Sequence, residues 1–341
     1  MLNPGNASRQ PQLIFSDRTI EEFDRLVLVE HPTVSNKELA DRQIEQLHIL
    51  EHGLEIVPVE SSPNPLVTLE RIKEAQGGNP EKSVVGMATG DGSSEAGVRA
   101  TLGNGALFWK IRGGNGDNIG RASFPRRDRG DSETILRKGK IAITSPGECL
   151  VADANGNIKY HFFFLDEVGF GDSAAASEAL NAQEQREKRE GFGQFKTLLS
   201  NGRASSEAIS LARPFSIKRG GVDPEAGDDT RPIEIRRELL YANLGHIANG
   251  WIRDIHMTDK KMVEVGNKRV SKLGAKLFFA RLYMNALSGT DIPDGEVIDF
   301  DIVEPTIMQK SGDHFNVAAG DHVTISRSSE EMLVYSTRPR P

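Results

Sequence analysis

Two glycine-rich turns that carry acidic residues are the part of this sequence best suited to chemistry. An apolar run ending at Ala88 leads into the first turn, 89–95, and the apolar run 107–111 leads into the second, 113–121. Glycine lets main-chain N–H groups approach a phosphate closely, and an aspartate among them can hold the accompanying divalent cation. Either turn alone is also typical of an ordinary surface turn. The pair, each preceded by an apolar segment, favours two loops facing one nucleotide.

The elements around these turns predict how they are positioned. Up to residue 138, short apolar strands such as 84–88 alternate with segments of helical spacing such as 94–102. This alternation predicts a parallel α/β sheet with ligand loops at the carboxyl ends of its strands. Beyond Lys138, turn-separated strands from 140–144 to 332–336 predict an antiparallel sandwich or barrel. We expect a parallel-sheet α/β nucleotide-binding domain over 13–138, an antiparallel β-sandwich domain over 139–330, and a C-terminal segment, 331–341.

Composition narrows the class of protein. The chain has 341 residues, more than one typical core, and its net charge of −7 argues against non-specific nucleic-acid binding. The single cysteine, Cys149, excludes an intramolecular disulfide and a cysteine-rich zinc site. The N-terminal residues lack an apolar signal core, and the apolar stretches are too short or too charged to span a bilayer. We therefore expect a soluble, cytoplasmic protein.

Several common motifs do not occur. The sequence has no GxxxxGK[ST] loop, and Gly120 lies one residue too far from Gly116 for a dinucleotide fingerprint. His48 and His52 have helical spacing but no evident third metal ligand. These absences exclude a P-loop enzyme and give no support to a zinc centre.

The order and spacing of several degenerate motifs resemble the diacylglycerol kinase and sphingosine kinase superfamily. That family has NPxSG, GGDGTxNE, GTANDFAR and DGE motifs at matching separations. No single motif is intact here, so the specificity lies in their order, which covers nearly the whole chain from residue 24. The similar segments are His31-Pro32-Thr33-Val34-Ser35, Thr89 to Glu95, Gly114 to Arg121, Phe162 to Gly171, Asn243 to Asn249, Met257 to Val263 and Met308 to Asp313.

The resemblance implies an ATP-binding α/β domain, a β-sandwich that receives a lipid, and an active site in the cleft between them. The reaction would transfer the ATP γ-phosphate to a hydroxyl of diacylglycerol or a related lipid alcohol, as in phospholipid biosynthesis. Mg²⁺ would accompany ATP, and the lipid would be reached by peripheral contact with a membrane surface. By position, Asp313 would accept the proton, and Asp91 and Asp259 would bind metal. The nucleotide would be bound by His31, Thr33, Thr89, Gly90, Asp91, Gly92, Ser93, Ser94, Glu95, Asn115 and Asp117.

Departures from the family pattern keep other functions open. Thr89 replaces a glycine, Glu95 occupies an asparagine position, and Ser311 replaces the aspartate of the DGE motif. A literal DGE occurs at 294–296, where it resembles a turn before a strand. The alternatives are a catalytically weak or inactive relative that binds lipid or nucleotide, and an enzyme similar to NAD kinase. The sequence leaves the oligomeric state open, with a homodimer as one option.

Overall fold

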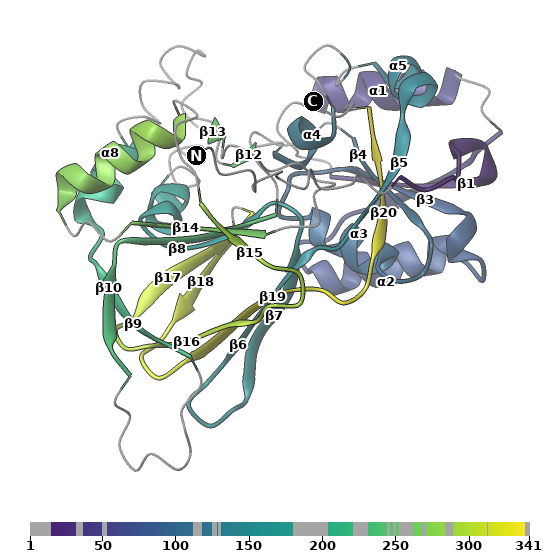
Figure 1. Cartoon of the computed structure of the whole chain (residues 1–341). Coiled ribbons are helices and arrows are strands. Elements are labelled where there is room, and N and C mark those ends of the chain that lie inside the picture. Colours follow the sequence, from purple (N-terminus) through teal and green to yellow (C-terminus); the bar gives the residue numbers. More distant parts are fainter. Residues whose placement is uncertain are drawn as a thin grey trace, which may run out of the picture.

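The structure, a computed structural model, describes residues 15–31, 37–49, 53–111, 118–124, 128, 131–179, 204–220, 231–243, 246–247, 250–251, 262–267, 271–283, 289–311 and 313–337. Within these residues the chain forms a mixed sheet flanked by helices and, beside it, two large antiparallel sheets (Figure 1). The predicted combination of an α/β part and a β-sandwich is confirmed.

The mixed sheet contains six strands: β1 (Arg25–Glu30), β2 (Glu55–Glu60), β3 (Ser83–Ala88), β4 (Leu107–Lys110), β5 (Lys140–Thr144) and β20 (Met332–Ser336). Their order is β2-β1-β3-β4-β20-β5. All neighbours are parallel except β5, which is antiparallel to β20 at one edge. β3 and β4 are buried along their whole length, as expected for parallel strands with helices on both faces.

The helices of this part are α1 (Lys37–Ile49), α2 (Pro65–Gln76), α3 (Ser94–Thr101), α4 (Asn118–Ser123) and α5 (Ser132–Lys138), with short 3-10 helices at Ile20–Glu22 and Pro80–Lys82. Leu47 of α1 and Ile135 of α5 belong to one apolar cluster of the sheet, and Ile72 of α2 and Val98 of α3 belong to a second. The sheet therefore has an apolar layer on each face, and the ends of its strands are left for ligands.

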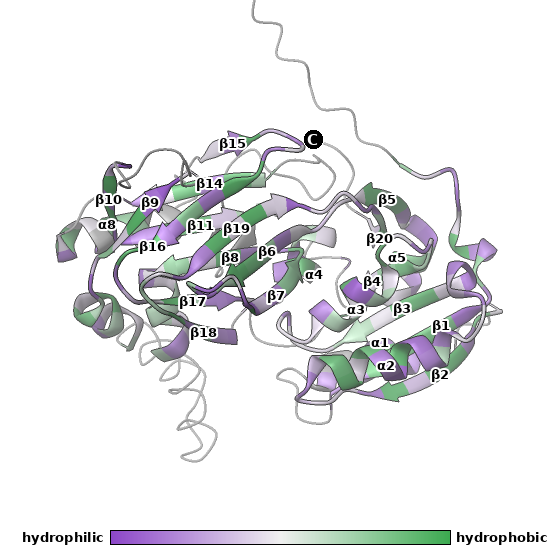
Figure 2. Cartoon of the chain, turned by 90° about the horizontal axis from the view of Figure 1, so that it is seen from below, coloured by the Kyte–Doolittle hydropathy of each residue, from purple (hydrophilic) through white to green (hydrophobic). Residues whose placement is uncertain are grey.

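The sandwich strands are β6 (Gly147–Ala152), β7 (Ile158–Phe164), β8 (Glu167–Gly171), β9 (Phe215–Arg219), β10 (Ile233–Arg236), β11 (Glu238–Ala242), β14 (Met262–Asn267), β15 (Thr290–Ile292), β16 (Ile298–Ile302), β17 (Thr306–Lys310), β18 (Asp313–Val317) and β19 (His322–Arg327). Their two sheets have the orders β10-β9-β16-β19-β6-β7 and β15-β14-β11-β8-β17-β18. Buried side chains from both sheets, including Phe162, Phe170 and Phe300, form one core. Figure 2 shows apolar and polar residues interspersed along the strands, as expected where one face of each sheet is turned to a shared core.

Smaller elements complete the described chain: the strands β12 (His246–Ile247) and β13 (Gly250–Trp251), the helix α8 (Lys272–Tyr283), and helical residues 172–179 and 204–211. Among the described residues, no helix combines the length and the apolar character needed to cross a bilayer.

Two strands expected in the β-rich part belong instead to the mixed sheet. β5 and β20 pair with each other, and β20 also pairs with β4 (Figure 1). A short apolar run predicts a strand but not its partner, because pairing depends on contacts far apart in sequence. The chain thus returns to its first sheet after completing the sandwich. The division into 13–138, 139–330 and 331–341 remains a prediction, and these pairings bear on where its boundaries should be drawn.

Candidate active site

The loop between β3 and α3 lies at the carboxyl end of the mixed sheet, where α/β folds bind their ligands. The Ser94 N–H donates to the Asp91 carbonyl at 3.0 Å, and the Ser94 hydroxyl donates to the Gly90 carbonyl at 3.1 Å. The ammonium group of buried Lys110 donates to the Thr89 carbonyl at 2.6 Å. These contacts fix the loop yet leave space at Gly90, since a Cβ added there would meet no atom within 4 Å.

Asp91 connects this loop to the second glycine-rich turn. Its Oδ2 accepts a hydrogen bond of 2.7 Å from the N–H of Asn118, the first residue of α4. Asn118 directly follows residues 112–117, which lie outside the described chain. The other oxygen of Asp91, Oδ1, is buried and has no hydrogen-bond partner in the described structure. Because an unsatisfied buried acceptor is costly, this oxygen is suited to binding a ligand or a cation.

Asp313 faces the same loop from the sandwich. It begins β18, and the β17–β18 register pairs it with Lys310. A Cβ placed on Gly92 would lie 3.2 Å from Oδ2 of Asp313 and 3.3 Å from the Ser311 carbonyl oxygen. The absence of a side chain at Gly92 therefore permits the hairpin to approach the loop this closely. The Asp313 side chain is still 59% exposed, so a ligand could reach it.

The surroundings of Asp313 affect its affinity for a proton. Nearby protein atoms reduce its hydration and raise the pKa of its carboxyl above the ordinary aspartate value, even though much of the side-chain surface remains accessible. Lys310, whose Nζ lies 4.0 Å from Asp313 Oδ2, lowers this pKa, whereas Glu95 raises it. A raised pKa makes the ionised carboxylate a stronger base. Asp313 thus combines an accessible carboxylate beside the Gly92 loop with an increased affinity for a proton.

Asp166 is a further acidic residue of the site that the sequence analysis did not single out. It lies between β7 and β8, is fully buried, and its Oδ1 accepts a hydrogen bond of 2.5 Å from the Ser311 hydroxyl. Burial and the nearby charge of Asp91 raise the pKa of Asp166 to about 6. Its Oδ2 has no hydrogen-bond partner in the described structure. The feature of the sequence that could have indicated Asp166 is the acidic pair Asp166-Glu167, which lies between an apolar run and a glycine-containing strand.

Most of the predicted residues that the structure describes lie together. Thr89 to Glu95 form the β3–α3 loop and the start of α3, and Asp313 lies against this loop. His31 follows β1, whose end is paired with the end of β3, so it lies along the same edge of the sheet. Thr33, Asn115, Asp117 and Asp259 lie outside the described residues.

The literal DGE segment at 294–296 has a different environment. Asp294 is 70% exposed in a turn, and its Oδ1 lies 3.4 Å from the guanidinium of Arg327. This matches the expected turn before a strand. Over the described residues, no group of three or more His, Cys, Asp and Glu side chains is arranged to hold a metal ion.

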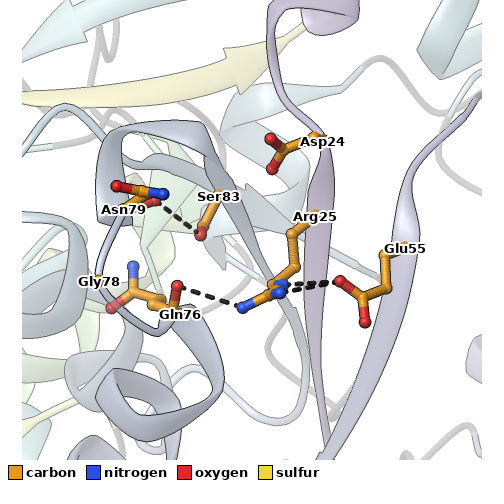
Figure 3. Close-up of a pocket in the computed structure, with 7 residues that line it drawn as sticks. All are labelled: Asp24, Arg25, Glu55, Gln76, Gly78, Asn79 and Ser83. Carbon is orange, nitrogen blue, oxygen red and sulfur yellow. Dashed lines mark hydrogen bonds and ion pairs between the residues drawn. The ribbon is translucent and has the colours of Figure 1, made fainter.

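A polar pocket of about 400 Å³ lies at the opposite, amino-terminal edge of the mixed sheet (Figure 3). Its lining residues are Asp24, Arg25, Glu55, Gln76, Gly78, Asn79 and Ser83. Arg25 is engaged there by Glu55 at 2.9 Å and by the Ala75 and Gln76 carbonyls at 3.0 and 3.3 Å. These contacts join β1, β2 and the end of α2, so they stabilise the fold. Ligand chemistry is better supported at the carboxyl edge.

Known structures share this architecture. No family model matches the sequence, and no curated protein matches it. A provisionally assigned diacylglycerol kinase from Bacillus anthracis str. Sterne is 12% identical, with a TM-score of 0.59 over 90% of this chain and 95% of that chain. A diacylglycerol kinase structure from the same strain is 10% identical, with a TM-score of 0.55 over 91% and 97%.

A yeast NADH kinase complexed with NADH is similar as well. It is 8% identical, with a TM-score of 0.52 over 95% of this chain and 89% of that chain. At such identities the likeness concerns the fold. The chain has the kinase fold of these structures, in which an α/β part adjoins a β-sandwich.

Proposed function

We propose that this protein is a kinase that transfers the γ-phosphate of ATP to a hydroxyl group of a lipid. The observation that carries the proposal is the approach of Asp313, from the sandwich, to Gly92 in the loop of the mixed sheet. A phosphate-binding loop opposite a carboxylate has the two parts that phosphoryl transfer needs, a cradle for the phosphates and a proton acceptor. The kinase fold of the similar structures supports the same class of reaction.

The nucleotide would be bound along the β3–α3 loop. Open space at Gly90 and the start of α3 at Ser94 support this, because main-chain N–H groups at the beginning of a helix attract phosphate. The residues proposed for ATP are His31, Thr33, Thr89, Gly90, Asp91, Gly92, Ser93, Ser94, Glu95, Asn115 and Asp117.

Mg²⁺ fits the donor set of this site. Asp91 Oδ1 and Asp166 Oδ2 are buried carboxylate oxygens with no hydrogen-bond partner in the described structure, and carboxylate oxygens are ligands that Mg²⁺ prefers. When bound, the metal would neutralise charge on the phosphates. Mg²⁺ commonly uses one or two protein carboxylates together with phosphate oxygens, so a larger acidic cluster is not required. Asp259 remains proposed for a separate metal site on the basis of the family resemblance alone.

In the reaction, the lipid hydroxyl oxygen would form the new bond to the γ-phosphorus, and the bond from that phosphorus to the ADP oxygen would break. The hydroxyl proton would pass to Asp313. Ser311, held by Asp166, would keep the hairpin turn against the loop. The chain's own residues thus supply the phosphate cradle and the base, and they keep the two parts aligned.

A membrane surface would supply the lipid, and α8 is the described element best suited to contact it. Leu273 and Leu277, one turn apart on α8, are 69% and 46% exposed, and the neighbouring Lys272 and Lys276 are exposed as well. Exposed leucines flanked by lysines are typical of helices that lie on anionic membranes. The described part of α8 contains no acidic residue. We propose peripheral attachment of a cytoplasmic protein, in line with a role in phospholipid biosynthesis, without nucleic-acid binding.

A kinase acting on NAD(H) is the second candidate, because the yeast NADH kinase has a similar fold. A non-catalytic relative is the third, because of the changed motifs. ATP consumption measured with diacylglycerol and other lipid alcohols in anionic vesicles, and separately with NAD and NADH, distinguishes the three. Mg²⁺-dependent turnover with a lipid alone supports the proposal. Turnover with NAD or NADH alone would replace it, and binding of ATP without any turnover would favour the non-catalytic relative.

A further inference from the structure

We infer that Lys310 is a positioning residue, held by Glu95 of the mixed-sheet part, which keeps the Asp313 carboxylate in place and ionised. This inference rests on the proposed function, since it assigns the partners of its proton acceptor. Its central observation is a chain of charges that crosses from α3 to the β17–β18 hairpin: Glu95, Lys310 and Asp313.

The hairpin determines the distance between Lys310 and Asp313. Lys310 ends β17, Asp313 begins β18, and the two are directly paired across the strands. Lys310 Nζ lies 4.0 Å from Asp313 Oδ2, within ion-pair range. The lysine side chain is buried, and its ammonium group lies 5.6 Å from the centre of the Phe162 ring. A buried ammonium near an aromatic face has little freedom to move, so it can orient the carboxylate.

Glu95 holds Lys310 from the other part of the molecule. Its Oε2 lies 2.5 Å from Lys310 Nζ, and both side chains are buried. Its Oε1 lies 2.8 Å from Arg99, one turn along α3. Arg99 in turn donates to the His161 carbonyl of β7 at 2.5 Å. A carboxylate engaged by two cations is fixed on both sides, so Glu95 connects the nucleotide loop to the hairpin that carries the base.

The charged groups around Asp313 have opposing effects on the pKa of its carboxyl group. Lys310 and His314 lower the pKa of Asp313, whereas Glu95 and the loss of hydration raise it. His314 lies on β18 and has a lowered pKa, mainly because of burial, although Glu178 and Asp313 counteract this effect. Removing Lys310 should therefore raise the pKa of Asp313. Removing the charge of Glu95 should lower it, both directly and because Lys310 is then free to move closer.

Carboxyl NMR of the full chain with labelled aspartate tests this inference without any substrate. The Asp313 signal is assigned by its loss in Asp313→Asn. We expect its titration midpoint to move up in Lys310→Met, to move down in Glu95→Gln, and to stay near the wild-type value in Lys310→Arg. Lys159→Met is the matched control, because Lys159 forms an ion pair of 2.5 Å with Asp321 elsewhere in the sandwich.

Shifts in the same direction for Lys310→Met and Glu95→Gln, or no shift in either, would overturn the inference. If Lys310→Met does not fold, a lowered midpoint in Glu95→Gln together with a wild-type midpoint in Lys310→Arg still supports the inference, and an unchanged midpoint in Glu95→Gln overturns it. Where turnover is measured, the acid limb of the kcat–pH profile should follow the NMR midpoints. In Lys310→Met and Lys310→Arg, the KM for ATP should stay within about threefold of the wild-type value, because Lys310 is not among the proposed ATP-binding residues. A protein without kinase activity would still show the NMR shifts, so this inference and the proposed function can fail separately.

Discussion

Gly92 and Asp313 approach one another so closely that a Cβ on the glycine would lie 3.2 Å from a carboxylate oxygen of the aspartate. The glycine belongs to the loop that follows β3 of the mixed sheet, and the aspartate begins β18 of the sandwich. A Cβ at this distance would be closer than in most real contacts, so the carboxylate would have to shift by a few tenths of an ångström to accommodate it. The position of Asp313 therefore depends on the size of residue 92.

Substituting this glycine should impair turnover more than nucleotide binding. In Gly92→Ala the added methyl group pushes the Asp313 carboxylate away from the loop, and small misplacements of a catalytic group reduce rate strongly. We expect kcat to fall by roughly tenfold to a hundredfold, with a smaller change in ATP affinity. Steady-state kinetics and calorimetric titration measure the two effects. Gly78→Ala is the control, because a Cβ at Gly78 would meet no atom within 4 Å. Unchanged kcat in Gly92→Ala would contradict the assignment.

Asp91 should be required for binding ATP together with Mg²⁺. Asp91→Asn keeps an oxygen to accept the Asn118 N–H but removes the charge that a cation needs. The affinity for Mg²⁺–ATP should fall by about tenfold or more, equivalent to about 1.4 kcal/mol. Titration of the folded variant with Mg²⁺–ATP, and with ATP in the presence of a chelator, measures this. Asp24→Asn, in the pocket at the opposite edge of the sheet, should bind normally. If Asp24→Asn lost affinity and Asp91→Asn kept it, the nucleotide site would lie at that pocket.

Replacing Asp313 should remove the base while preserving ATP binding. General-base removal costs roughly 10²–10⁴ in rate, so Asp313→Asn should lower kcat by that order. Asp294→Asn should have little effect, since Asp294 is exposed in a turn and contacts Arg327. Both variants are compared by single-turnover kinetics with saturating ATP. The reverse result would show that the literal DGE segment is catalytic.

The local elements of the site could be predicted from the sequence, because each depends on neighbouring residues. The apolar run up to Ala88, the glycines that follow it and the helical spacing beyond Ser94 predict a strand, a turn and a helix. The proximity of Asp313 to this turn had no local signal and was expected only from the order of motifs in a known family. The structure provides its geometric basis in the β17–β18 register.

Other features depend on contacts between distant segments. The place of Asp166 in the site depends on its hydrogen bond with Ser311 and on the nearby charge of Asp91. Both of these residues are far from Asp166 in the sequence. β20 resembles the sandwich strands in composition, but it pairs with β4 and β5 of the first sheet. Periodicity describes which faces are buried and carries no information about the partner strand, so neither feature followed from pattern alone.

The proposed membrane contact predicts a defect in vesicle binding. Leu273→Ser combined with Leu277→Ser removes the exposed apolar groups of α8 and leaves its lysines in place. Partitioning onto anionic vesicles should weaken by roughly tenfold or more, given the apolar area lost. Sedimentation with vesicles measures it, and turnover of a short-chain, water-soluble substrate should change little. Ile158→Ser, an equally exposed site at the start of β7, is the control. Equal weakening in the control would exclude α8 as the contact.

Glu238 provides a test of the fold that is independent of catalysis. It begins β11, is fully buried, and accepts a hydrogen bond of 2.7 Å from the Ser173 N–H, while its Oε1 has no partner in the described structure. Burial raises the pKa of Glu238 to about 8, from an ordinary value of 4.5. The folded protein therefore holds this carboxyl in its protonated form over a range of pH in which the unfolded chain ionises it.

The sign of the stability effect follows from this difference. Below pH 4.5 the carboxyl is protonated in both states, and as the pH rises towards about 8 the unfolded chain alone releases the proton, so folding loses free energy. Glu238→Gln cannot ionise and can still accept the Ser173 N–H. The free energy of unfolding of Glu238→Gln, relative to that of the wild type, should therefore increase across this interval, by on the order of 5 kcal/mol at most. Urea denaturation at a series of pH values measures the difference, with Glu296→Gln, an exposed site, as the control. A difference that stays constant with pH would show that Glu238 is ionised in the folded protein.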